Sequence, residues 1–245
     1  MYLLLSGEGV SDIGQGRSDA EVCEGEDFLV GPMAAIVLRI VDGQNPGSID
    51  ARAYGYVSKQ SLTRRASELK PANKRKNLAL PGRKRAKETR YFFNNARIFA
   101  RIAMEVADSL KRQVVAVLFR DADGTVSAGR GEWEAKRQSM LDGFEEERFT
   151  GGVPMVPKPK SEAWLLCAFK TAPYQSCDSL EERSGNDNSP NSLKRELERL
   201  LDDVTPESLR RKVALEFDVE KIQIRSFAAF RDRLKEVVER LRISS

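Results

Sequence analysis

Acidic residues follow two short apolar runs of the chain, a pattern typical of a divalent-cation site. Glu8 comes soon after the run Tyr2–Leu5, and Asp121 and Asp123 follow the run Val114–Phe119. Such runs predict strands that are buried on both faces, as in a parallel sheet. Since open α/β sheets bind ligands at the carboxyl ends of their strands, we expect the three carboxylates to meet there. Clustered carboxylates need a cation, and a hard ion with oxygen ligands suits them, Mg²⁺ first and Mn²⁺ second.

These two motifs resemble those of the Toprim domain of topoisomerases, bacterial primases and overcoming-lysogenization-defect nucleases. That family carries a Glu-Gly turn after its first strand and an Asp-x-Asp motif after a later one. Gly7-Glu8-Gly9 and Asp121-Ala122-Asp123-Gly124 match them. The resemblance covers about half of the chain, and a basic helical insertion accounts for the long separation of the motifs. It implies that Glu8, Asp121 and Asp123 bind Mg²⁺, and that the chain is a nuclease, an endonuclease acting on DNA or RNA.

The acidic residues can be given separate roles. Asp121 and Asp123 alternate along an extended backbone, so we expect one to bind the metal directly and the other through water. Glu8 either completes the site or acts as general acid–base near the scissile phosphate, and Asp12 supports it. The metal would generate hydroxide and stabilise the charge that develops at the phosphate.

A second candidate segment, Lys158–Glu162, precedes a helix that contains Trp164. Standalone Toprim-like proteins resemble the chain here too, with an acidic residue before a Trp-Leu-Leu helix. In this reading Lys160 contacts the phosphate and Glu162 is a further metal ligand. The residues alone equally allow a solvated loop, with Ser161 as the helix N-cap and Trp164 in the core. They leave the roles of Lys160 and Glu162 open.

The segment from Gln60 to Arg101 is strongly basic, with Glu68 and Glu88 as its only acidic residues. Charge runs are often solvated faces, but a basic run beside a phosphodiesterase site favours a nucleic-acid groove. The predicted nucleic-acid-binding residues are Arg64, Arg65, Lys74, Arg75, Lys76, Arg83, Lys84 and Arg85.

The composition excludes several classes of protein. The chain contains no histidine, which removes Ser-His-Asp triads, HNH nucleases and His-ligated zinc. Its three cysteines, Cys23, Cys167 and Cys177, are too few for a four-thiolate zinc site and suit a reducing cytoplasm. No apolar run approaches the roughly 18–20 residues of a membrane span. We therefore expect a cytoplasmic protein without membrane contact.

The order of the predicted elements indicates an α/β fold, a mostly parallel sheet flanked by helices. We expect a Toprim-like catalytic domain over 1–170, with the basic helical insertion at about 59–112, and a helical C-terminal region over 171–245. Strands are predicted at 2–6, 54–57, 114–119 and 153–156, helices at 26–41, 87–112, 132–147, 192–202 and 226–240, and a loop at 171–192.

Two other interpretations remain at this point. Asp121-Ala122-Asp123-Gly124-Thr125 also fits the first motif of haloacid-dehalogenase-like phosphatases, in which Asp121 would be the nucleophile. That interpretation leaves Glu8 without a role and lacks a later acidic motif. The other is a non-catalytic nucleic-acid or partner-binding module with a decayed site. The resemblance to standalone Toprim-like proteins further implies bacterial antiviral defence beside an ATPase partner.

Overall fold

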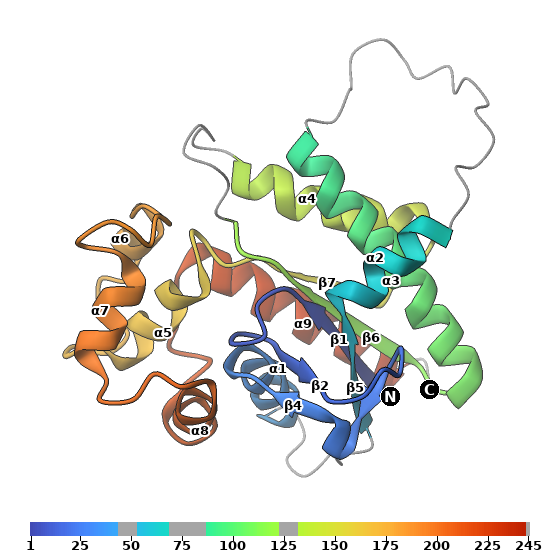
Figure 1. Ribbon diagram of the computed structural model, residues 1–245, viewed down its shortest axis with the longest axis horizontal. Helices are drawn as coiled ribbons and strands as arrows, with labels where there is room; N and C mark the ends of the chain where they lie inside the picture. The colour runs from blue at the N-terminus through green and yellow to red at the C-terminus, as the bar shows by residue number, and fades with distance from the viewer. Residues whose placement is uncertain (44–52, 69–86, 123–131, 244–245) are drawn as a thin grey trace.

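The fold is built on a five-stranded sheet in the order β3-β5-β1-β6-β7 (Figure 1). The computed structural model describes residues 1–43, 53–68, 87–122 and 132–243. Strands β1 (Tyr2–Gly7), β5 (Tyr54–Ser58), β6 (Val114–Phe119) and β7 (Gly152–Met155) run parallel, and the short β3 (Cys23–Glu24) pairs antiparallel with β5. The predicted α/β class with a mostly parallel sheet is therefore confirmed.

Helices cover both faces of the sheet, which is why every residue of β1 and β6 is buried. Leu3 and Leu5 of β1 belong to one hydrophobic core, whereas Leu4 belongs to the other, as the alternation of a strand requires. The first core is closed by α1 (Pro32–Gly43), α5 (Ser161–Phe169), α8 (Pro206–Glu216) and α9 (Arg225–Ile243). The second is closed by α2 (Lys59–Glu68), α3 (Lys87–Leu110) and α4 (Glu132–Glu146), and α3 and α4 lie side by side (Figure 1).

The strand register decides what lies at the carboxyl edge of the sheet. Gly7 of β1 is opposite Ser58 of β5 on one side and Phe119 of β6 on the other. The next residues along the chain, Glu8, Lys59 and Arg120, therefore leave three neighbouring strands at the same edge. This register is the structural basis of the candidate site.

The C-terminal region is helical and shares the first core. It contains α6 (Asp178–Glu181), α7 (Leu193–Leu200), α8 and α9, and α9 packs against β7 and α1. Trp164 of α5 has no exposed surface, and its ring lies 5.0 Å from that of Phe227 and 5.6 Å from that of Phe230. The core position predicted for Trp164 is confirmed.

Two helix predictions need correction. Phe28–Val30, expected inside a helix over 26–41, forms strand β4 against β2 (Gly14–Gly16), and α1 begins only at Pro32. The reason is local, because proline suits the first turn of a helix and disfavours helical backbone in the residue before it. Helix α8 was not predicted, although Thr205 before Pro206 carries the signal; its side chain accepts a hydrogen bond from the Ser208 backbone N–H.

The cysteines also differ from expectation. Cys167 and Cys177 form a disulfide, and Cys23 is a buried free thiol. Their separation along the chain gave no sign of this pairing, which depends on α5 and the start of α6 lying side by side.

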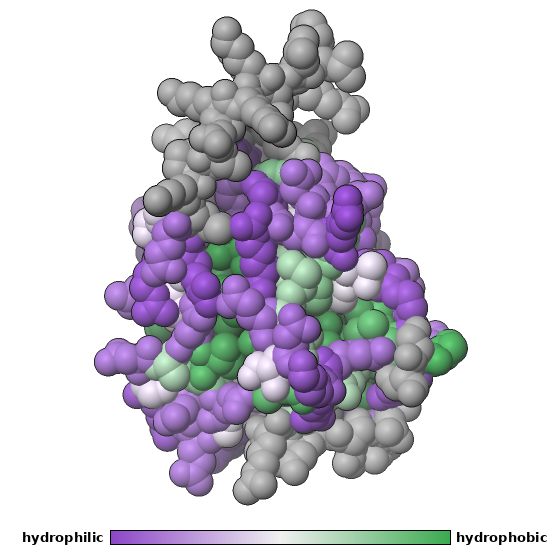
Figure 2. Space-filling view, turned by 90° about the vertical axis from the view of Figure 1, so that its right-hand side faces the viewer, coloured by the Kyte–Doolittle hydropathy of each residue, from purple (hydrophilic) through white to green (hydrophobic). Residues whose placement is uncertain are grey.

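Polar side chains dominate the molecular face shown in Figure 2, where apolar side chains are visible only in patches between them. Within the described ranges, no helix combines the length and the apolar character that crossing a membrane requires.

Candidate active site

Glu8 is an ionised carboxylate that lies between α2 and α3, two of the helices that close the second core. Its Oε2 accepts a hydrogen bond from Lys59 Nζ at 2.6 Å and one from the Tyr91 hydroxyl at 3.4 Å. Burial raises the pKa of Glu8, but the Lys59 hydrogen bond and the charges of Arg120 and Lys59 outweigh it, so the pKa is lowered. The side chain remains 36% exposed, so a ligand can reach it.

Arg120 lies beneath this edge and was not recognised from the sequence. Its side chain has no exposed surface, and Nη1 donates to the Phe119 carbonyl at 2.8 Å. Among the described residues, its Nε and Nη2 have no hydrogen-bond partner. Its guanidinium carbon lies 5.8 Å from the centre of the Tyr91 ring. Because a buried, partly unpaired guanidinium is costly, its presence here is a reason to expect a functional role.

Asp121 stabilises the start of α5. Its Oδ1 accepts a hydrogen bond from the backbone N–H of Ser161 at 3.0 Å. The predicted N-cap role of Ser161 is therefore wrong: Ser161 is the first helical residue, and the side chain of the N-cap residue Lys160 makes no capping bond. The Ser161 hydroxyl instead donates to Oδ1 of Asp12 at 2.6 Å. Ser161 thus joins carboxylates that follow β1 and β6.

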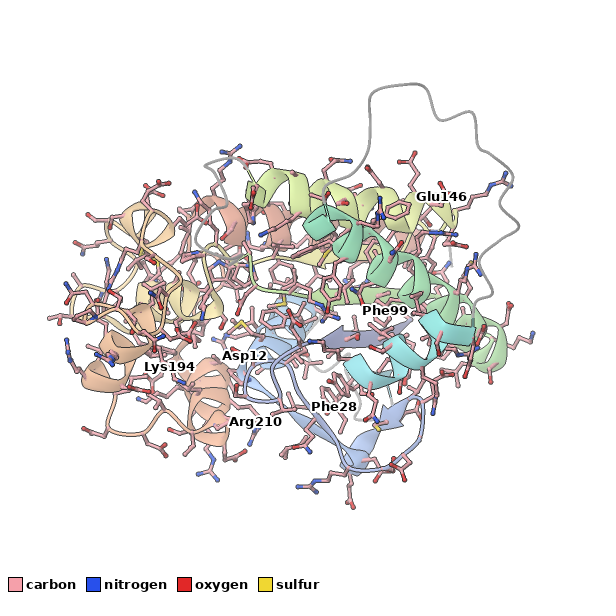
Figure 3. All side chains as sticks on the ribbon, turned by 45° about the horizontal axis from the view of Figure 1, so that its top comes forward. Asp12, Phe28, Phe99, Glu146, Lys194 and Arg210 are labelled. Atoms are coloured by element: carbon pink, nitrogen blue, oxygen red, sulfur yellow. A yellow bond between two sulfur atoms is a disulfide. The ribbon has the colours of Figure 1, made fainter. Side chains whose placement is uncertain are left out.

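Asp12 and Glu162 form a half-buried acidic pair beside Ser161. Burial raises the pKa of Asp12 and that of Glu162, and the charge of Asp12 raises the latter further. Figure 3 shows Asp12 on the side of the sheet that faces Lys194 of α7. The positive charge of Lys194 lowers the pKa of Asp12 and so opposes the effect of burial. Lys160 is 14% exposed and lies 2.9 Å from Asp187, so its amine already has an acidic partner.

Buried side chains from α4 support the turn after β6. Lys136, only 2% exposed, donates from Nζ to the Ala122 carbonyl at 2.8 Å. Trp133 Nε1 donates to the Val156 carbonyl at 2.6 Å, which ties α4 to the end of β7. These contacts fix the backbone that carries Asp121, and the sequence pattern did not predict them.

The predicted ligands therefore occupy two neighbouring parts of one edge. Asp121 and Glu162 lie together with Asp12 around Ser161, whereas Glu8 lies with Lys59 and Tyr91. Asp123 is outside the described residues. Within the described ranges, no group of three acidic or cysteine side chains is placed to hold a metal ion. A site with two carboxylates, such as Glu8 and Asp121, nevertheless suits Mg²⁺, because proteins commonly bind this ion with one or two carboxylates plus substrate phosphates.

A cavity of about 700 Å³ opens beside Glu8, within the usual size range of ligand pockets. It lies between the loop after β1 and the first turns of α2, and its lining includes Gln15, Tyr56, Lys59 and Arg64. The cavity gives a substrate a path to the carboxylate of Glu8.

The basic segment is only partly described. Arg65 of α2 makes two hydrogen bonds of 2.6 Å to Glu21 and pairs with Glu105, and Arg64 lies 3.5 Å from Glu21. These ion pairs reduce the charge that both arginines offer to a nucleic acid, whose binding here stays a prediction. The remaining predicted contacts, Lys74, Arg75, Lys76, Arg83, Lys84 and Arg85, lie outside the described residues.

Comparison with protein-family models, with curated proteins and with solved structures gave no match, so the function must be inferred from this geometry.

Proposed function

We propose that this chain is a Mg²⁺-dependent nuclease with a Toprim-like site, hydrolysing phosphodiester bonds of DNA or RNA. One observation carries the proposal: Glu8 and Asp121 follow neighbouring parallel strands whose last residues, Gly7 and Phe119, are directly opposite each other. Ligand sites of open α/β sheets form at this edge. Mn²⁺ is the expected substitute for Mg²⁺.

Each residue at this edge of the sheet has a separate role in the proposed reaction. Glu8 and Asp121 would hold the ion, together with Asp123 from the same motif. When bound, Mg²⁺ would activate water and neutralise charge on the scissile phosphate. Lys59, which is 54% exposed, can exchange Glu8 for a phosphate oxygen and so orient the substrate. Arg120 adds fixed positive charge beneath Glu8 and, after the Lys59 hydrogen bond, lowers the pKa of that carboxyl.

The cellular setting belongs to the same proposal. Resemblance to standalone Toprim-like proteins suggests an effector of antiviral defence that acts beside an ATPase partner. The basic segment after β5 would guide the nucleic acid toward the edge.

The test is cleavage of labelled single- and double-stranded DNA and of RNA, with Mg²⁺, Mn²⁺ or EDTA. Glu8→Gln and Asp121→Asn remove ligand charge, while the asparagine can still accept the hydrogen bond from Ser161. The matched control is Glu207→Gln, because Glu207 is an exposed carboxylate in ion pairs on α8. Metal-dependent cutting that is lost in both site variants and kept in the control would support the proposal. Cutting that survives both site substitutions would refute the site.

A second candidate is a non-catalytic nucleic-acid-binding module. The observation in its favour is that Glu8 and Lys160 both have oppositely charged partners at 2.6 Å and 2.9 Å, as at a site without catalytic use. A module of this kind would retain its affinity for nucleic acid in EDTA and would cut no substrate. A phosphatase would instead hydrolyse small phosphomonoesters and leave polynucleotides intact.

A further inference from the structure

A second cavity, of about 560 Å³, lies at the opposite edge of the sheet, where β7 begins. Its walls come from the second half of α4, from the segment that leads into β7 and from α9. In the described part of the chain, four arginines line it: Arg137, Arg148, Arg233 and Arg240. The candidate active site uses none of them.

The acidic residues in this cavity do not balance the arginines. Among the described residues, the acidic lining consists of Glu145 and Glu236. Glu236 forms ion pairs with two arginines, at 2.9 Å from Arg233 and 3.6 Å from Arg240. Arg233 also donates to the Gly152 carbonyl at 3.4 Å. Within the described lining, four guanidinium groups face two carboxylates, so this part of the cavity carries an excess of positive charge.

The guanidinium group of Arg137 is incompletely hydrogen-bonded among the described residues. Its Nε is buried and has no hydrogen-bond partner among the described residues. Burial, and then the neighbouring charge of Arg233, lower the pKa of Arg137. An arginine stays protonated in a protein, so an anion bound beside Arg137 would offset the cost of this arrangement.

The residues that line the cavity indicate which class of anion it would bind. Guanidinium groups bind phosphate oxygens bidentately, and several together suit a group that carries more than one phosphate. The cavity is larger than one phosphate needs, and Leu141 and Phe149 provide an apolar wall. We propose that this cavity binds the di- or triphosphate group of a small ligand, with Arg137 and Arg233 as its principal contacts. The group could belong to a nucleotide or to an inorganic polyphosphate, and the apolar wall favours the nucleotide.

Titration calorimetry on the full chain in EDTA tests this, because the chelator removes the metal-dependent edge from the measurement. The probes are ATP, GTP, tripolyphosphate and orthophosphate. We expect Arg137→Gln and Arg233→Gln each to weaken ATP or tripolyphosphate binding about tenfold or more. Arg211→Gln, in an exposed ion pair on α8, is the control and should leave binding unchanged.

Glu236→Gln gives a test of opposite sign, because it removes a carboxylate that competes for Arg233 and Arg240. Binding of the same probes should tighten several-fold. Nucleotides that bind at least tenfold more tightly than tripolyphosphate would identify a nucleotide site, and equal affinities would identify the phosphate chain as the recognised group. Failure of ATP, GTP and tripolyphosphate alike to bind, orthophosphate binding as tight as tripolyphosphate, or affinities unchanged by both arginine variants would overturn the proposal. Cleavage activity enters none of these readouts, so the proposal is independent of the nuclease assignment.

Discussion

Replacing Arg120 by methionine is expected to stabilise the fold while it damages the site. Two of its guanidinium nitrogens are buried without partners among the described residues. Each unsatisfied donor costs about 1–3 kcal/mol, whereas the lost bond to the Phe119 carbonyl is worth about 1.5–3 kcal/mol. Methionine keeps most of the apolar stem, and replacing buried charges by apolar groups often stabilises by about 1–4 kcal/mol. We therefore expect a gain of about 1–3 kcal/mol in the free energy of unfolding.

Arg231 provides the matched control, because it is a buried arginine whose guanidinium is well bonded. It donates to the carbonyls of Val219 and Ile222 at 3.2 Å and pairs with Asp232 at 2.9 Å. Arg231→Met leaves these carbonyls without a donor and should destabilise by about 2–4 kcal/mol. The same chemical change is thus predicted to have opposite signs at the two positions.

Urea unfolding at pH 7, followed by circular dichroism, measures both variants. For a chain of this length the Arg120→Met gain corresponds to a melting temperature higher by about 2–12 °C. Cleavage should fall about tenfold or more, because the edge loses a fixed positive charge that would stabilise the negative charge developing at the phosphate. If Arg120→Met destabilises as much as Arg231→Met, the guanidinium is a structural anchor and the reasoning is refuted.

Three further perturbations test separate parts of the account. Lys59→Met should raise Mn²⁺ affinity up to about fivefold in the absence of substrate, because it frees Glu8 from an exposed ion pair worth about 0.2–1 kcal/mol; unchanged or weaker binding would contradict this. Asp121→Ala should lower stability about 1 kcal/mol more than Asp121→Asn, since only asparagine can still accept from Ser161, and equal unfolding curves would exclude the capping role. Burial raises the pKa of Glu147, but hydrogen bonds from Arg101 and Arg97 outweigh this effect, so the pKa is lowered. Glu147 therefore contributes fully to the free energy of unfolding above its ordinary pKa of 4.5, and this contribution is lost as the pH falls through the folded-state pKa. Glu147→Gln should therefore cost about 1–3 kcal/mol at pH 7 and progressively less as the pH falls below 4.5 in urea unfolding, and a difference independent of pH would count against the pairing.

The strands and their edge were predictable because their signal is local. The apolar runs Tyr2–Leu5 and Val114–Phe119 form β1 and β6, and the parallel arrangement brings the residues after them to one edge. The burial of Trp164 was predictable for the same reason, because an apolar helix start can be recognised without knowing its partner.

Long-range pairings at the site were not predictable. Lys59 meets Glu8 only because β5 lies beside β1, and nothing near either residue indicates that strand order. Arg120 looked like an ordinary charged residue after a strand, and its burial depends on helix α3, which contributes Tyr91. The disulfide depends on helix packing in the same way.

A double-mutant cycle on metal-dependent cleavage tests the central claim most directly, using Glu8→Gln, Asp121→Asn and the double variant. If both carboxylates serve one metal site, each single substitution should lower kcat/KM about 100-fold or more. The double variant should then lose little beyond the worse single variant, because residues that act as a unit are not additive. Losses that multiply in the double variant would show that Glu8 and Asp121 act independently and would contradict a shared site.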